Sequence, residues 1–319
     1  MPVPVPATVA AVSRERADLS RRLHKLGRVF ALDALRREPL PAQTVVQYYE
    51  DCHDAYRKYH SAEGAVHMAL NDGDRFDPAG FYGQLRRIER AWARPPTAVL
   101  ELAFGQGFNL AWLAARHAGC QFSGIDLTPA HLDIAKRRVA KANLRNVTMT
   151  LGDFHQLPYA AASFDEVFCI EAFCYATDLP RALAEVARVL RPGGCFTLFD
   201  GYLPRPPVQL DTEEALAVEL VAKGMAIDGL QVQAELLAAA AAAGLQSVAT
   251  AALDGEVMPS LRKLERVTGA VIRFPWLGRR ALARRSPMRG RNVLAGYLMR
   301  CTVALGLIGY RHLTLRKEI

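Results

Sequence analysis

The 319-residue sequence contains no apolar run long enough to cross a membrane. Such a span needs about 18 consecutive apolar residues, and the best candidate, residues 292–310, is interrupted by Arg300. The first segment that favours a helix, residues 9–34, is rich in arginine and lacks the apolar stretch of a signal peptide. We therefore expect a cytoplasmic protein.

Cysteine is scarce, with six residues that lie far apart and mostly inside apolar segments. There is no CxxC pair, and no spacing of histidine and cysteine suits zinc. We expect reduced, buried thiols and no metal site built from these residues. With 51% hydrophobic and 23% charged residues, the composition is that of a globular protein and excludes a disordered chain.

Acidic residues are scarce at the two ends of the chain. Residues 261–319 hold 14 basic and 2 acidic side chains and residues 1–40 hold 8 and 4, whereas residues 41–260 hold 18 and 26. No nucleic-acid-binding module and no basic patch interleaved with aromatics accompanies them, so we expect no nucleic-acid partner. The basic ends are consistent with solvated arginine faces, with contact to an anionic membrane surface, or with a phosphorylated substrate.

Short apolar strands and helical stretches alternate from residue 95 onward, which favours a parallel sheet with crossover helices. We predict an α/β fold: a Rossmann-like, mostly parallel seven-stranded sheet with helices on both faces. Residues 1–94 are expected to form a helical N-terminal lid, and residues 95–319 the core. Helical cap inserts are expected after strands 5 and 6, at residues 205–243 and 257–301. The strands are expected at residues 98–103, 121–125, 147–151, 166–170, 195–200, 246–253 and 310–317.

The first predicted strand runs into a glycine turn, Gly105-x-Gly107, that opens a helix. Glycine lets a ligand approach the backbone, and a helix N-terminus offers unpaired N–H groups. The turn does not complete a dinucleotide-binding motif, because Leu110 stands where a third glycine would be. Asp126 ends the next strand about 20 residues after the turn, where a carboxylate can accept both hydroxyls of a ribose.

Three further motifs follow the next strands in order. Gly152-Asp153-Phe154 ends the third strand and suits an adenine edge, residues 164–171 cover the fourth strand, and residues 187–194 lead through the turn Pro192-Gly193-Gly194 into the fifth. No single motif is specific, but the series of five resembles the class I S-adenosylmethionine-dependent methyltransferases over about residues 97–200.

The resemblance implies a cofactor site for S-adenosylmethionine, with S-adenosylhomocysteine as the product. The family usually has glycine where this chain has Ala103, and we expect binding to survive the added methyl group. Asp126 would take the ribose hydroxyls, and Asp153 with Phe154 would frame the adenine. The residues implied in cofactor binding are Glu101, Ala103, Gly105, Gly107, Asp126, Leu127, Asp153, Phe154 and Glu171.

A second resemblance concerns the acceptor of the methyl group. Residues 170–175 are similar to the stretch after the fourth strand in sterol C-methyltransferases and related isoprenoid or lipid methyltransferases, and residues 48–68 look like their lid. This implies C-methylation of a hydrophobic, isoprenoid- or sterol-like acceptor through a carbocation. Aromatic faces stabilise such a cation, and a carboxylate can remove the proton that ends the reaction. The implied catalytic residues are Glu171, His67 and Tyr49, and the implied substrate contacts are Tyr48, Tyr49, Tyr56, His67 and Tyr175.

Other interpretations stay open. Glu171 can instead bond the cofactor or lid, or cap a helix, while His67 and the tyrosines can be ordinary packing residues. The runner-up reaction is O-methylation of a hydroxyl on a polyketide, glycolipid or other secondary metabolite, with His67, His155 or Glu171 as base. A non-catalytic cofactor-binding protein is a third hypothesis, to which Ala103 lends support. Mg²⁺ is expected only if the acceptor is a diphosphate, and the sequence leaves open whether the chain forms a homo-oligomer.

Overall fold

The computed structural model describes residues 9–41, 44–283 and 286–319. Its centre is a seven-stranded sheet in the order β3-β2-β1-β4-β5-β7-β6. Only β7 runs antiparallel to its neighbours, so the predicted mostly parallel Rossmann-like fold is confirmed. The strands are β1 (Ala98–Leu102), β2 (Gln121–Asp126), β3 (Val147–Leu151), β4 (Phe164–Ile170), β5 (Leu190–Tyr202), β6 (Leu245–Ala252) and β7 (Gly309–Lys317).

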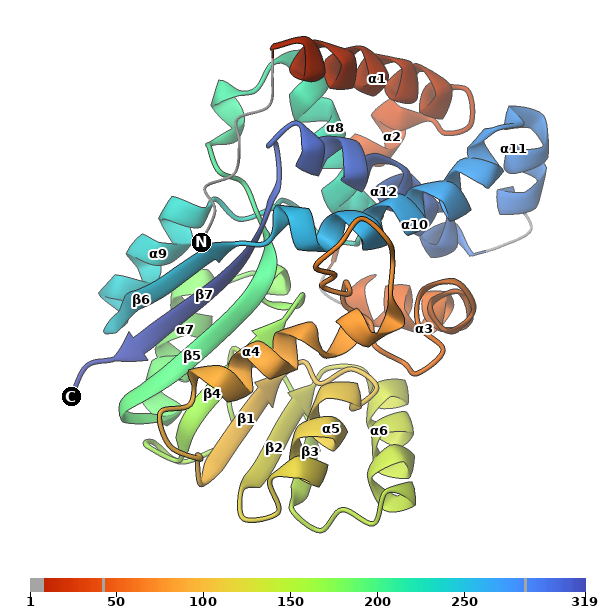
Figure 1. Cartoon of the computed structure of the whole chain (residues 1–319). Helices are drawn as coiled ribbons and strands as arrows, with labels where there is room; N and C mark the ends of the chain where they lie inside the picture. Colours follow the sequence, from red (N-terminus) through yellow and green to blue (C-terminus); the bar gives the residue numbers. More distant parts are fainter. Residues whose placement is uncertain (1–8, 42–43, 284–285) are drawn as a thin grey trace.

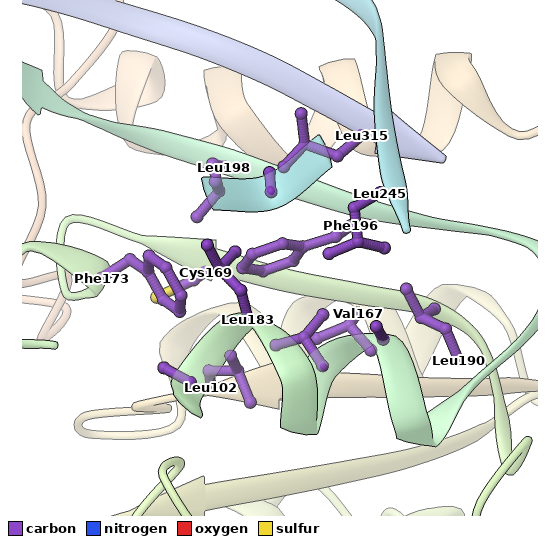
Figure 2. Packing of buried hydrophobic residues seen from close by; sticks show 14 of the residues in the cluster. Leu102, Val167, Cys169, Phe173, Leu183, Leu190, Phe196, Leu198, Leu245 and Leu315 are labelled. Atoms are coloured by element: carbon purple, nitrogen blue, oxygen red, sulfur yellow. The ribbon is translucent and has the colours of Figure 1, made fainter. Parts of the chain in front are cut away.

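Both faces of the sheet are buried, which explains why its central strands are apolar without alternation. Val167 and Cys169 pack with the helices α7 (Leu179–Val189) and α9 (Gln233–Ala242) on one face. Figure 2 shows this cluster, where Leu183 of α7 lies among residues of β4 and β5. The opposite face carries Phe168 and Ile170, which pack with α4 (Gly83–Ala91) and α5 (Phe108–Arg116). Further along this edge lies α6 (Pro129–Lys141).

A group of helices gathers beyond one end of the sheet (Figure 1). It combines N-terminal helices with the inserts that follow β5 and β6, and α1 packs on α8 and α12. These helices are α1 (Val9–Gly27), α2 (Leu32–Arg37), α3 (Thr44–Ala55), the π-helix η1 (Tyr56–His60), the 3-10 helix η2 (Pro78–Tyr82), α8 (Thr212–Gly224), α10 (Asp254–Ile272), α11 (Pro275–Ala283) and α12 (Pro287–Ala304). Two short 3-10 helices, η3 (Phe173–Tyr175) and η4 (Pro207–Gln209), complete the elements.

Two local expectations from the sequence are wrong. Pro192-Gly193-Gly194 lies inside β5, where Gly193 has a φ of 77° and the pairing with β4 shifts register, and does not form a turn before the strand. The helix-favouring segment 9–34 is divided between two helices, because α1 ends at Gly27 and α2 begins at Leu32. No helix of the described residues has the length and hydropathy of a membrane span. The six cysteines are free thiols, and all except Cys195 are buried.

An ion-pair network fixes α1 onto the two helices of the last insert. The Arg300 guanidinium lies 3.1 Å from the Glu15 carboxylate, 3.0 Å from Asp18 and 2.8 Å from Glu265, and its side chain is only 15% exposed. Arg22 also pairs with Asp18 and Glu265. These contacts connect α1, α10 and α12.

We predict that Arg300→Ala lowers the free energy of unfolding by about 2 kcal/mol or more, because three half-buried carboxylates lose their shared partner. Denaturant titration measures the change. Arg36→Ala is the matched control, since Arg36 and Glu219 form an exposed pair whose loss should change stability by less than about 1 kcal/mol. Equal effects of the two substitutions would contradict the assignment.

Candidate active site

The glycine turn after β1 has a backbone that side chains rarely allow. Gly105 and Gly107 have φ angles of 55° and 70°. A Cβ atom at position 107 would lie 2.8 Å from the Cβ of Ala135, so α6 packs too closely for any side chain there. Ala103 also has a positive φ, 55°, which costs an L-residue roughly 1–2 kcal/mol. The chain therefore keeps the turn at Ala103 with some strain.

Glu101, next to the last residue of β1, offers a buried oxygen beside this turn. The residue is 1% exposed, and Oε1 accepts a hydrogen bond from Asn109 Nδ2 at 2.7 Å. Oε2 is buried and has no partner in the described part of the chain. Burial raises the pKa of this carboxyl to about 8. An unpaired buried carboxylate oxygen needs a donor, and the ammonium group of the cofactor's methionine part would supply one.

Asp126 fastens the glycine turn to the start of α6. Its carboxylate accepts hydrogen bonds from the backbone N–H groups of Gly105 and Thr128, both at 2.8 Å, and contacts His131 Nδ1 at 3.3 Å. A carboxylate has about four acceptor positions, so capacity for a ribose hydroxyl remains. The hydroxyl of Thr128 makes no capping bond at the start of α6.

Apolar and aromatic side chains follow Asp126 where the adenine is expected. Leu127 is 43% exposed, and Phe154 stacks on Phe173 with ring centroids 5.7 Å apart. The exposed Asp153 carboxylate pairs at 2.6 Å with Nδ1 of His155, whose Nε2 accepts from the Asp178 backbone. Both nitrogens of His155 are thus engaged away from the cavity described below, so this geometry does not favour His155 as a base.

The lid segment, defined here as residues 64–68, passes between the glycine turn and β4. Val66 lies 3.2 Å from the place a Cβ of Gly105 would occupy. The Met68 backbone N–H donates to Glu171 Oε1 at 2.7 Å. The ring of His67 is buried between the Met68 carbonyl and the Asn109 side chain, 3.1 Å from each, and burial lowers its pKa.

His67 therefore differs from its predicted role. It does not line the cavity, because both ring nitrogens point to protein groups, so it is placed to position Asn109 and not to touch an acceptor. Through Asn109 it connects to Glu101. The prediction of His67 as a direct substrate contact is not supported by this arrangement.

Glu171 stands at the carboxyl end of β4 with a φ of 52°. Its Oε1 accepts a second hydrogen bond, 2.7 Å long, from the Tyr310 hydroxyl, and its backbone N–H donates to the Phe199 carbonyl. Burial raises the pKa of Glu171 to about 8, and the nearby Asp200 carboxyl contributes to the rise. Asp200 follows Phe199, the last residue of β5 that pairs with β4. Burial raises the pKa of Asp200 to about 6.

A cavity of about 520 Å³ lies between these two carboxyl groups and the helices beyond the sheet. Its walls are mostly aliphatic side chains of α8, α10 and α12 together with six tyrosines, and Arg289 is the only arginine or lysine among the described lining residues. Glu101, Gly105, Gly107 and Asp126 are not part of the lining. The tyrosines are Tyr48, Tyr49, Tyr56, Tyr59, Tyr175 and Tyr310.

The tyrosine hydroxyls are largely bonded to protein groups. Tyr48 and Tyr56 share a 3.0 Å bond, and Asn292 Nδ2 donates to Tyr48 at 2.9 Å. Tyr49 lies 3.3 Å from the Tyr175 hydroxyl. Because the hydroxyls are satisfied, these residues present mainly ring surface to the cavity. The structure thus brings together four predicted residues, Tyr48, Tyr49, Tyr56 and Tyr175, with Glu171.

The cavity lining also includes residues that the sequence did not predict, among them Asp200, Tyr310, Asn292 and His60. Asp200 had a signal, because it ends a predicted strand in the same way as Asp126 and Glu171. Tyr310 had none, since its place depends on β7 returning antiparallel beside β5, where Tyr310 pairs with Gly201.

The cavity does not suit Mg²⁺ with a diphosphate. Its charged lining consists of two carboxyls, Glu171 and Asp200, and Arg289, which already donates to the Asp51 carbonyl. Among the described residues, one cluster has metal-ligand spacing, Glu15, Asp18 and Cys301. Both of its carboxylates are paired with Arg300, and none of the three lines the cavity.

Comparison with known proteins agrees with this architecture. Residues 99–194 match the profile of the methyltransferase domain family. This stretch of the chain is thus similar to a methyltransferase domain. That stretch contains β1 to β4 and the start of β5, with the glycine turn, Asp126 and Glu171.

Relatives and solved structures extend the likeness. Methyltransferase GfsG of Streptomyces halstedii is 32% identical over 174 residues, 53% of this chain and 59% of that protein. The rice 24-methylenesterol C-methyltransferase 2 is 30% identical over 155 residues, 48% and 42% of the two chains. The chain thus matches about half the length of these curated relatives.

Two solved structures share the fold at low identity. The [4+2]-cyclase SpnF has a TM-score of 0.70 at 19% identity, covering 88% of this chain and 98% of its own. The geranyl diphosphate C-methyltransferase of Streptomyces coelicolor, solved with Mg²⁺, geranyl diphosphate and S-adenosylhomocysteine, has a TM-score of 0.64 at 15% identity with the same coverage.

We predict that Glu101→Gln weakens binding of S-adenosylhomocysteine at least tenfold, because the cofactor's ammonium group loses a charged acceptor worth about 1.5–3 kcal/mol. Titration calorimetry measures the dissociation constant. Glu166→Gln is the matched control: Glu166 is equally buried in the adjacent strand, and its pKa is also raised to about 8, but its carboxylate accepts from Thr197, away from the turn. Unchanged affinity in Glu101→Gln would refute the assignment.

Proposed function

We propose that the protein transfers a methyl group from S-adenosylmethionine to a carbon atom of a neutral, hydrophobic acceptor of the isoprenoid or sterol class. The observation that carries this proposal is the apolar cavity with the Glu171 carboxyl group at the end of β4, where the lid segment is bonded to it. Ligands of such sheets bind beyond the carboxyl ends of the strands, where Glu171 stands.

The cavity walls suit an acceptor that becomes positively charged. When bound, S-adenosylmethionine supplies an electrophilic methyl group, and the chain chiefly has to bring the acceptor carbon into line with it. Methylation of an alkene leaves a cation on the acceptor. Tyrosine rings of α3, η1 and η3 face the cavity and can stabilise that cation through their π-systems.

Glu171 is placed to remove the proton that ends the reaction. The hydrogen bonds from Met68 and Tyr310 both go to Oε1, so Oε2 has no hydrogen-bond partner among the described residues and remains for the acceptor. The tight hold on one oxygen fixes the direction of the other. The raised pKa of about 8 makes the carboxylate a stronger base than an exposed glutamate.

A neutral acceptor agrees with the charge of the cavity better than a diphosphate does. The two carboxyls disfavour a diphosphate, and the one arginine of the lining already donates to a protein carbonyl, whereas the aliphatic walls favour hydrocarbon. Because the cavity does not suit a phosphorylated acceptor, we propose that the basic residues 261–319 contact an anionic membrane surface. The sterol C-methyltransferase relatives support the acceptor class by their names, over the half of the chain that they match.

O-methylation is the second candidate, and one observation favours it. Asp200 gives the cavity a second carboxyl, with a pKa raised to about 6, that can accept a hydroxyl proton directly. Relatives with 34–35% coverage of this chain include a malonyl-[acyl-carrier protein] O-methyltransferase of Halorhodospira halophila and a demethylmenaquinone methyltransferase of Deinococcus radiodurans. A role without methyl transfer is the third candidate, since the structurally similar SpnF is named as a [4+2]-cyclase.

We predict that Glu171→Gln lowers turnover by at least about 100-fold while cofactor binding is kept, because the amide cannot accept the proton. Turnover of the wild type should rise as the pH increases through about 8, since the Glu171 carboxyl is protonated below its raised pKa. Initial rates between pH 6 and 9.5 test both statements. Full turnover in a Glu171→Gln enzyme that binds cofactor would exclude Glu171 as the base.

Asp200→Asn separates the two carboxyls in the same assay. It removes a negative charge that helps to raise the pKa of Glu171, so the rise in rate should remain and move to lower pH. If Asp200→Asn abolishes turnover and Glu171→Gln does not, the base belongs to the second candidate.

We predict that the product formed with a methyl-¹³C-labelled cofactor carries a new C–CH₃ group. Carbon NMR distinguishes this group from O–CH₃ by chemical shift, with squalene, sterols and polyprenols as first acceptors. A new O–CH₃ signal would select the second candidate, and cofactor binding without any labelled product from these acceptors would favour the third.

A further inference from the structure

Two large aromatic side chains, two positions apart in the sequence, are exposed at the junction of α10 and α11. Phe274 is 51% exposed and Trp276 is 67% exposed. Apart from Tyr59, the other large hydrophobic residues that are exposed in the described chain, such as Val208, Val248 and Leu151, are aliphatic and lie on separate elements. An exposed tryptophan beside an exposed phenylalanine is the type of surface that enters the interface of a lipid bilayer.

The segment that carries these two rings contains several arginines and no acidic residue. Arg273, Arg279 and Arg280 are exposed, and the structure gives none of them an ion pair with a described residue. The chain has no aspartate or glutamate between Glu265 and Glu318. Elsewhere in the helical group, arginines such as Arg300 are paired. Unpaired arginines around exposed aromatics complement an anionic lipid surface.

The acceptor cavity reaches the molecular surface next to this patch. Ala270 and Tyr59 both line the cavity and are both exposed. Arg273 keeps helical dihedral angles after the end of α10, so Phe274 lies about one helical turn beyond Ala270 on the same side. In Figure 1, α11 projects at the outer end of the helical group, away from the sheet.

We propose that Phe274, Trp276 and the exposed arginines of α11 dock the protein onto an anionic phospholipid bilayer, from which the acceptor enters the cavity beside Ala270. The inference rests on the proposed function in that the acceptor is a neutral lipid. The two kinds of side chain act together: the rings insert among the lipids, while the arginines bind lipid phosphates. Neither alone gives stable attachment to a membrane.

Vesicle binding tests the docking surface without acceptor or cofactor. We expect the full chain to sediment with vesicles of phosphatidylcholine and phosphatidylglycerol, to bind pure phosphatidylcholine much more weakly, and to lose binding at high salt. Phe274→Ala/Trp276→Ala and Arg279→Gln/Arg280→Gln should each weaken binding at least tenfold, about the effect of two lost surface contacts. Lys136→Gln/Arg137→Gln is the control, an exposed basic pair on α6 that Figure 1 shows well apart from α11.

Fluorescence locates the contact, because Trp276 is one of three tryptophans and by far the most exposed. Its emission should shift to shorter wavelength with anionic vesicles and be quenched by brominated lipids, and Trp276→Phe should remove both effects. Wild-type affinity of the Phe274→Ala/Trp276→Ala variant, or equal binding to neutral vesicles, would overturn the proposal.

The docking surface and the methyltransferase activity can fail separately. With a neutral acceptor in detergent micelles, the docking variants should keep wild-type turnover, whereas with acceptor in anionic vesicles they should be slower by a similar factor as their binding. Vesicle binding without turnover in either medium would refute the proposed function and leave the docking surface standing. Turnover in micelles without any vesicle binding would refute the docking surface alone.

Discussion

The buried carboxyl group of Glu171 joins three segments that are far apart in the sequence. Its Oε1 accepts from Met68 of the lid segment and from Tyr310 of the last strand, while its own backbone extends β4. These bonds place residues 64–68 against the glycine turn and close one end of the cavity. Without them, the direction of the free carboxylate oxygen would not be defined.

Buried carboxyls are a constraint on stability as well as a source of chemistry. Glu101 and Glu171 each have a pKa raised to about 8 by burial. The unfolded chain releases these protons near pH 4.5, so the folded state binds more protons between these values and its free energy of unfolding falls as the pH rises through that range. A bound ammonium group at Glu101 would offset part of this loss. The protein thus keeps buried carboxyl groups, whose ionisation is unfavourable, where we infer that the cofactor and acceptor bind.

Much of the fold follows from local sequence. Alternating apolar strands and helices predict the sheet, and the strand ends at Glu101, Asp126 and Glu171 predict where a site would form, because parallel strands present their carboxyl ends at one edge. The roles predicted for these residues in cofactor binding and catalysis remain predictions.

The remainder of the site depends on tertiary contacts that spacing does not encode. Tyr310 reaches Glu171 across 139 positions only because β7 reverses direction beside β5. His67 has the sequence context of a lid contact, yet Asn109 of α5 binds its ring and turns it away from the cavity. The start of β5 at Leu190 was also missed, because glycine and proline normally mark a turn and here occupy a strand with a register shift.

The central claim, transfer of a methyl group to a neutral lipid in the tyrosine-lined cavity, is tested most directly by following the label. The purified protein would be incubated with methyl-labelled S-adenosylmethionine and a total lipid extract, and the extract then separated into neutral and acidic fractions for mass spectrometry. We expect label in the neutral fraction with the wild type and none with the Glu171→Gln variant. Label confined to acidic, diphosphate-bearing lipids, or equal labelling by the two proteins, would contradict it.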